Sequence, residues 1–241
     1  MKTFLKARWE NIVMINYEVD DAVLQPYLPY DVELDTHNNK SFVSLVGFRF
    51  LDSKLFGLPI PYFGSFDEVN LRFYVKRKDN DEVKRGVVFI SEVVPFKIVS
   101  FMANWLYKEH YSYSKMKHEC EIKEGAKHLA YHWQKNNHDF HIKAKFDNAA
   151  KDIESNSLEE FIYEHYYGFT KINNSETWEY KVNHPRWFTN EMVDYDIRCD
   201  FEKMYGNDFA FLNNQKPFSV YNAVGSEVSI DWKINKIAIA K

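Results

Sequence analysis

The stretch EVNLRFYVKRKDNDEVKRGVVFISEVV, residues 68–94, contains two runs of alternating apolar and polar side chains joined by a polar link. A period of two is the pattern of β-strands, and a short link rich in Asp and Asn between two such runs is typical of a hairpin. The basic residues beside the link are interleaved with acids. We therefore interpret them as a hairpin tip rather than a surface that binds nucleic acid.

The same period recurs along the chain and predicts an α+β protein whose sheet is mostly antiparallel. Further strands are expected at 40–51, 128–133, 139–146, 176–183 and 226–234. Helices are expected within 20–29, from Pro95 onward, and within 157–168. The last helix has a capping box, Ser157 with Glu160, and we expect Gly168 to end it.

Composition limits the class of protein. The 241 residues are 45% hydrophobic and 17% aromatic, enough for a real core, and the net charge of −4 argues against nucleic-acid partners. No run approaches the roughly 20 apolar residues of a membrane span, and the N-terminus lacks a secretion signal, so we expect no membrane partner and a cytoplasmic location. Two distant cysteines, Cys120 and Cys199, encode neither a disulfide framework nor a zinc cluster.

The polar run at 146–157 is either a domain boundary or a long surface connection. A boundary would require the remaining C-terminal segment to form a core of its own, so a surface connection is favoured. We therefore expect a single domain over residues 1–241.

One face of the strand that begins at Glu68 is polar. Glu68, Asn70, Arg72 and Tyr74 alternate with four apolar residues, so they share a face. This face is either solvated or, if the sheet curls into a barrel, turned toward a cavity. In a cavity, a carboxylate, an amide and a guanidinium could orient a small ligand.

Two charged residues interrupt apolar rows. Glu92 is expected on the face of Val88, Ile90 and Val94, and Arg49 on that of Val43, Leu45 and Leu51. A carboxylate in an apolar row must be paired or have its pKa raised, and Arg72 and Lys97 are candidate partners of Glu92. For both residues, a structural ion pair and a functional role stay open.

Lys97 lies at the start of the second expected helix. With Pro95 in the first helical position, helical spacing predicts a buried stripe of Ile98, Val99, Phe101, Met102, Trp105 and Leu106. Lys97, Ser100, Asn104 and Lys108 then form the opposite, solvated stripe. A lysine near the positive end of a helix dipole nevertheless has a lowered pKa, which suits an amine nucleophile. Both interpretations stay open.

The remaining motifs predict neither a metal site nor a cofactor. His128 and His132 share a strand face, but His138 and His141 point to opposite faces and no acidic ligand accompanies them. The chain has no serine elbow, no phosphate loop and no glycine-rich dinucleotide motif.

The order of several motifs resembles a known family. RWENIVMINYEVDDAVLQPYLPYDVEL (8–34), KSFVSLVGFRFL (40–51), SLEEFIYEHYYGFT (157–170) and PFSVYNAVGSEVSIDW (217–232) resemble the YqjF-like family of uncharacterised bacterial proteins. That family is similar to the acetoacetate decarboxylase-like superfamily. The resemblance implies a closed, curved antiparallel sheet, a β-barrel, with a central pocket and a few peripheral helices. It also implies that the chain could form a homo-oligomer.

The resemblance also concerns site residues. The decarboxylases carry a Schiff-base lysine in a PKK motif, a pocket glutamate in a G-x-Y-x-E motif and an arginine near the N-terminus. Here GSFDE (64–68) places Glu68 at the carboxylate, and Arg8 is the candidate arginine. In PFK (95–97), Phe96 stands where the first lysine would be, and Lys97 matches only the second. The resemblance therefore implies a retained pocket and an apparently lost nucleophile.

Three functional hypotheses follow. In the first, a barrel pocket binds a small carboxylate- or carbonyl-bearing molecule: Arg72 or Arg8 pairs with the acid group, Asn70 orients it, and Glu68 and Glu92 act as acid or base. Arg49 and Tyr74 complete the candidate ligand-binding residues. In the second, Lys97 forms a Schiff base with an oxo acid. In the third, the chain is a non-catalytic interaction protein with an exposed apolar patch and no enclosed cavity.

Overall fold

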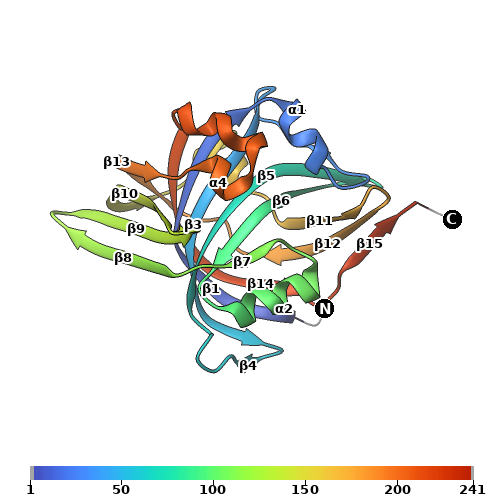
Figure 1. Ribbon diagram of the computed structural model, residues 1–241, viewed down its shortest axis with the longest axis horizontal. Helices are drawn as coiled ribbons and strands as arrows, with labels where there is room; N and C mark the ends of the chain where they lie inside the picture. Colours follow the sequence, from blue (N-terminus) through green and yellow to red (C-terminus); the bar gives the residue numbers. More distant parts are fainter. Residues whose placement is uncertain (1–2, 240–241) are drawn as a thin grey trace.

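Fifteen strands joined in one sheet make up most of the computed structural model, which describes residues 3–239 (Figure 1). The strands of the first half are β1 (Thr3–Val19), β2 (Glu33–Leu34), β3 (Ser41–Leu55), β4 (Leu58–Pro59), β5 (Phe66–Asp79), β6 (Glu82–Val94), β7 (Tyr111–Tyr113) and β8 (Met116–Lys123). Those of the second half are β9 (Ala126–Lys135), β10 (His138–Lys151), β11 (Tyr167–Asn173), β12 (Glu176–Asn183), β13 (Thr189–Arg198), β14 (Ser219–Asp231) and β15 (Asn235–Ala238).

Seven of these strands close into a ring. They follow the order β12-β11-β6-β5-β3-β1-β14, and the ring closes because Val182 and Asn183 of β12 pair with Ile230 and Ser229 of β14. Neighbours are antiparallel, except that β6 runs parallel to β11 and to β7. The expected mostly antiparallel, closed and curved sheet is confirmed.

A second group of strands, β13, β10, β9 and β8, continues the sheet beyond β14. Figure 1 shows the β8–β9 hairpin projecting away from the ring. Side chains of β9 and β10, including Tyr131 and Ile142, pack in one apolar cluster with Val69, Leu71 and Phe73 of β5. These strands therefore cover the outer face of part of the ring.

The inner face of the ring has an apolar cluster of its own. Met14, Val46, Tyr74 and Phe161 belong to it, and alternation along β5 separates Tyr74 from Phe73. Both faces of β5 are thus buried, which rules out the solvated face considered for its polar row.

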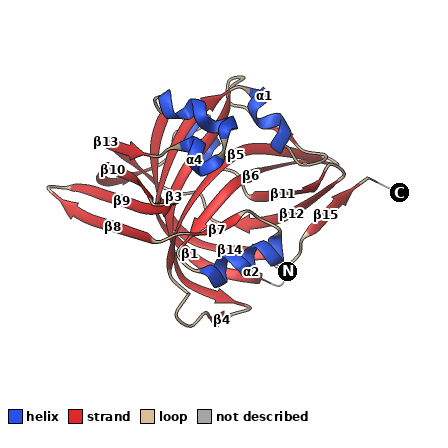
Figure 2. Ribbon diagram, in the orientation of Figure 1, coloured by secondary structure: helices blue, strands red, loops and turns tan. Residues whose placement is uncertain are grey.

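The helices lie at the periphery of the sheet, as Figure 2 shows for α1, α2 and α4. Their bounds are α1 (Asp21–Leu24), α2 (Lys97–Tyr107), α3 (Leu158–Tyr163) and α4 (Phe201–Tyr205), with 3₁₀ helices η1 (Gln25–Tyr27) and η2 (Asn207–Asn214). Within residues 3–239, no helix is long and apolar enough to cross a membrane.

Two helix boundaries differ from the predictions. Ser157 caps α3 as expected, accepting a hydrogen bond from the Glu160 N–H, but α3 ends at Tyr163 and Gly168 lies inside β11. The helix after Pro95 begins at Lys97 with Phe96 as its N-cap, so Pro95 precedes the first turn instead of opening it.

The packing of α2 departs from the predicted stripes at both faces, although Lys97 and Lys108 are exposed as predicted. Ser100 is its one buried residue, whereas the Phe101 and Trp105 side chains are 67% and 66% exposed. The Ser100 hydroxyl and the Asn104 amide both donate to the Tyr111 carbonyl, and the Tyr111 N–H donates back to Asn104. The helix is held by its polar face because β7, a short strand, needs partners for its backbone groups.

Candidate functional site

A cavity of about 70 Å³ lies inside the ring, and every one of the seven ring strands contributes to its wall. We call it the polar chamber. Its charged and polar lining includes Glu68, Asn70 and Arg72 of β5, Glu92 of β6, Tyr111 of β7, His165 and Tyr180. The row predicted along β5 is therefore turned into a cavity, and neighbouring strands add to it.

Glu92 reaches this chamber because of a β-bulge. Leu71 pairs with Ser91, but the next residue of β5, Arg72, pairs with Phe89. Ile90 is therefore an extra residue in β6. The bulge reverses the alternation, and Glu92 pairs with Asn70 instead of continuing the row of Val88. The predicted face for Glu92 was wrong, since a period of two cannot anticipate a one-residue slip.

Glu68 is held at the centre of the lining. Its Oε1 accepts a hydrogen bond of 2.9 Å from the Asn70 amide, and its Oε2 accepts one of 3.3 Å from the Tyr111 hydroxyl. Only 2% of Glu68 is exposed. Burial raises the pKa of its carboxyl to about 7, although the two hydrogen bonds and the Arg72 charge oppose the shift.

Two more buried carboxyls stand nearby. Burial, with the negative charges of Glu109 and Glu68, raises the pKa of Glu92 well above its ordinary value. Burial also raises the pKa of Glu109 to about 7, even though its Oε1 accepts from the Thr170 hydroxyl at 2.6 Å and the Tyr180 hydroxyl at 3.0 Å. No group of three or more His, Cys, Asp or Glu residues in the described chain is arranged to hold a metal ion.

Arg72 forms no ion pair with a described residue, although its charge lowers the pKa of the nearby Glu68 carboxyl. Its Nη2 contacts the sulfur of Met14 at 3.6 Å, and its guanidinium lies over the Tyr74 ring, 5.8 Å from the centroid. Its buried Nε has no hydrogen-bond partner among the described residues. A half-buried guanidinium facing a cavity in this way is suited to a carboxylate ligand.

His165 lines the chamber, and a contact with Asp35 fixes the position of its imidazole ring. Its Nε2 lies 3.1 Å from Asp35 Oδ2, and Arg85 also donates to Asp35. Burial lowers the pKa of His165 to about 4, so the ring is neutral near pH 7. The Asp35 contact requires the proton on Nε2, which leaves the buried, unpartnered Nδ1 as a hydrogen-bond acceptor.

Five buried polar atoms without a partner in the described chain thus belong to residues of one chamber. They are Trp9 Nε1, Asn70 Oδ1, Arg72 Nε, Glu92 Oε2 and His165 Nδ1. Buried polar groups are nearly always hydrogen-bonded, so a ligand or water must satisfy these atoms. They supply a cation, an indole N–H donor, two acceptors and a carboxyl whose pKa is raised well above its ordinary value, mainly by burial.

Lys97 does not line the polar chamber. It stands in the first turn of α2, its side chain is exposed, and its Nζ lies over the Tyr113 ring, 5.3 Å from the centroid. The other predicted catalytic residues, Glu68 and Glu92, are brought together without it.

The remaining predicted ligand-binding residues also lie outside this lining. Arg8 is half exposed, forms ion pairs with Glu10 at 2.7 Å and Asp52 at 3.6 Å, and borders an open groove. Arg49 lies 3.2 Å from Asp67 across the β3–β5 pair. Tyr74 is buried beneath the chamber and shares a hydrogen bond of 2.6 Å with Ser44.

Sequence analysis missed His165, Glu109, Tyr111 and Tyr180. Glu109 follows Lys108, the left-handed residue that ends α2, and His165 follows the end of α3. Neither is part of a periodic pattern in the sequence, so only tertiary contacts reveal them. The alternating pattern of Glu176–Asn183 did predict the strand that carries Tyr180. It did not predict that the Tyr180 side chain faces a cavity.

Gly168 provides a first testable prediction. A Cβ at this position would lie 2.1 Å from the Tyr180 ring and 2.4 Å from its hydroxyl oxygen, so Gly168→Ala must displace the ring and its hydrogen bond to Glu109. We expect a loss of roughly 1–3 kcal/mol of stability in urea unfolding. The same substitution in a Tyr180→Ala background should cost much less, and an equal cost there would refute this explanation.

Comparison with known proteins places the chain in a family. Residues 6–227 match the model of DUF2071, which is described as an uncharacterized conserved protein. The chain belongs to this family. It is also 26% identical over 196 residues to the uncharacterized protein YqjF of Bacillus subtilis (strain 168), covering 80% of this chain and 78% of that protein.

Solved structures of acetoacetate decarboxylase-like proteins share the fold of this DUF2071 member. One is an acetoacetate decarboxylase-like enzyme from Sphingomonas wittichii RW1, with a TM-score of 0.66, 12% identity, and coverage of 99% of this chain and 94% of that one. Another is the acetoacetate decarboxylase of Legionella pneumophila subsp. pneumophila str. Philadelphia 1, with a TM-score of 0.63, 15% identity and coverage of 98% and 87%. A third is the enduracididine biosynthesis enzyme MppR complexed with pyruvate, with a TM-score of 0.63, 11% identity and coverage of 98% and 91%. These likenesses agree with the predicted fold.

Proposed function

We propose that this protein binds a small oxo acid or related carboxylate in the polar chamber, within one domain formed by the whole chain. The observation that carries the proposal is Arg72, a guanidinium that lines the chamber and whose buried Nε has no hydrogen-bond partner among the described residues. A carboxylate at this position gains charge-assisted hydrogen bonds that no described side chain supplies.

The carboxyls of the chamber favour a carbonyl group next to that carboxylate. Burial and two acidic neighbours raise the pKa of Glu92 well above its ordinary value, which favours the protonated carboxyl. A protonated carboxyl can donate a hydrogen bond to a carbonyl oxygen, which an ionised one cannot. A ligand that has a carboxylate but no carbonyl group would leave this donor without an acceptor.

His165 supports proton transfer as the chemistry of the site. Asp35 holds the ring from behind and leaves the neutral Nδ1 lone pair available as a general base, while Glu92 provides a general acid. This pairing is suited to removing a proton from the carbon beside a carbonyl. In this role His165 takes the proton and Glu92 stabilises the enol oxygen, and neither step needs a lysine nucleophile.

Pyruvate is the probe of choice, since the similarly folded MppR has been solved in complex with it. We expect saturable binding in calorimetry that is weaker at pH 8.5 than at pH 6, because Glu68 and Glu109 ionise between these values. Acetone, which lacks the carboxylate, should bind far more weakly. Equal heats for acetone and pyruvate, or none for pyruvate, would contradict the proposal.

Borohydride reduction separates this proposal from the Schiff-base hypothesis. Because the Lys97 side chain is exposed and outside the chamber lining, we expect no pyruvate adduct in the intact mass after reduction. Lys97→Met should bind pyruvate as the unmodified protein does. An adduct that Lys97→Met abolishes would establish amine catalysis instead.

The interaction-protein hypothesis concerns a different surface. Exposed apolar side chains on the outer side of α2, above all Phe101 and Trp105, are of the kind that form contacts between subunits. The homo-oligomer stays a prediction, and it is compatible with a ligand chamber inside the ring.

A further inference from the structure

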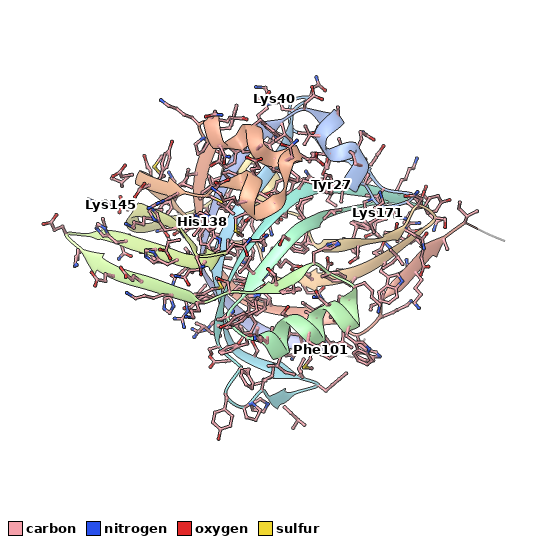
Figure 3. All side chains as sticks on the ribbon, in the orientation of Figure 1. Tyr27, Lys40, Phe101, His138, Lys145 and Lys171 are labelled. Carbon is pink, nitrogen blue, oxygen red and sulfur yellow. The ribbon has the colours of Figure 1, made fainter. Side chains whose placement is uncertain are left out.

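A second cavity, of about 160 Å³, lies beneath α2. We call it the apolar chamber. Apolar side chains of β1, α2 and the segment after β4 form most of its wall, including Phe4, Phe63, Phe66, Val99, Met102 and Leu106. Figure 3 shows Phe101 on the same helix, but Phe101 is not part of this wall.

The cavity follows from the way α2 is docked. Ser100 and Asn104 attach the helix to the Tyr111 carbonyl. In this position the apolar side chains of α2 form one wall of the cavity and do not fill it. Protein interiors seldom leave voids much larger than a water molecule. An apolar cavity of roughly 150 Å³ stays dry and accepts benzene, so this one has room for a group of that size.

The two chambers share a wall. Phe50, Tyr111, Tyr180 and Ile230 line both. The Tyr111 hydroxyl donates to Glu68 of the polar chamber, and the Tyr180 hydroxyl donates to Glu109 of the apolar chamber. A single ligand with a polar head and an apolar tail can therefore contact both cavities along these two tyrosines.

We propose that the apolar chamber is the subsite for the tail of the ligand, which makes the ligand an oxo acid bearing an aryl or branched alkyl group of about six carbon atoms. This inference rests on the proposed function, with the carboxylate on Arg72. The polar chamber alone, at about 70 Å³, has no room for such a group. Specificity then depends on the residues of α2 that line the second cavity.

The test compares pyruvate with phenylpyruvate in calorimetry. Phenylpyruvate should bind on the order of tenfold more tightly, or better, because its ring enters an apolar pocket. Ala103 lines the apolar chamber from α2, and Ala103→Trp should fill it, removing the advantage of phenylpyruvate while pyruvate binds as before. Val99→Phe is a second filling variant. The matched control is Phe101→Ala, on the exposed side of α2, which should change neither affinity.

Each outcome decides between the two proposals. If pyruvate binds but phenylpyruvate binds no better, or both filling variants leave its advantage intact, the tail subsite is wrong and the proposed function stands. If phenylpyruvate binds only while the apolar chamber is open and Arg72→Met has no effect, the subsite stands without the carboxylate anchor. If neither acid binds, both proposals are overturned.

Discussion

Replacing Arg72 by Met is expected to weaken pyruvate binding by about 10- to 150-fold, the equivalent of roughly 1.5–3 kcal/mol for hydrogen bonds to a charged group. Methionine keeps most of the apolar stem and loses the guanidinium with its Nη2 contact to the Met14 sulfur, so the substitution removes the charge with little change in packing. Calorimetric titration of the variant with pyruvate at pH 6 measures the loss.

The same variant should not lose stability. Arg72 forms no ion pair in the described chain, so removing its half-buried charge relieves a desolvation cost. The variant also loses the favourable effect of this charge on the Glu68 carboxylate, but this loss is small at pH 6, where a carboxyl with a pKa of about 7 is mostly protonated. Arg49→Met is the matched control, because Arg49 is paired with Asp67 away from the chamber. It should lower stability in urea unfolding and leave pyruvate affinity unchanged. If the two variants behave alike, Arg72 is a structural residue.

Glu92→Gln is expected to stabilise the protein increasingly as the pH rises. Glu92 has a raised pKa in the folded state and an ordinary value of 4.5 when unfolded. Its contribution is therefore fully present below about pH 4.5 and is lost as the pH rises toward the folded pKa, since the unfolded state ionises first. Glutamine resembles the protonated form and has no such loss.

The difference in unfolding free energy between Glu92→Gln and the unmodified protein should grow by up to about 1.4 kcal/mol per pH unit from pH 5 upward. Urea unfolding at pH 5.5, 7 and 8.5 measures it, and the comparison cancels the titration of most other groups. Glu179→Gln serves as the control, since Glu179 is also buried but forms ion pairs with Lys84 and Arg77. This substitution removes the charge of a paired carboxylate and should lower the unfolding free energy. A Glu92 variant that is less stable at every pH would argue that the carboxyl is ionised and paired.

Alternation along single strands predicted β3, β5, β6, β9, β10, β12 and β14, but not β1, β8, β11 or β13. The polar row of Glu68, Asn70 and Arg72 was correctly placed on one face of a strand, because β5 pairs with β3 without a register shift. The sequence alone could not show whether that face was exposed to solvent, because this depends on the pairing of β12 with β14, which closes the ring.

The errors have local physical causes. The bulge at Ile90 turned Glu92 into the chamber, against the simple period of two. Helical spacing in α2 correctly grouped Ser100 with Asn104 but placed this pair in solvent, whereas its hydrogen bonds to Tyr111 hold it against β7 and leave Phe101 and Trp105 exposed. His165 and Glu109 each follow the end of a helix, where no period exists to predict their direction.

The claim on which the account depends is that the Arg72 guanidinium faces a ligand chamber inside the ring. The most direct measurement is the ¹⁵N–¹H signal of Arg72 Nε, assigned by its absence in Arg72→Met and followed during titration with pyruvate at pH 6. We predict a saturable shift of this signal with the affinity found by calorimetry, while the Arg49 Nε signal stays constant. An Arg72 signal that does not move at pyruvate concentrations that saturate the protein would contradict the account.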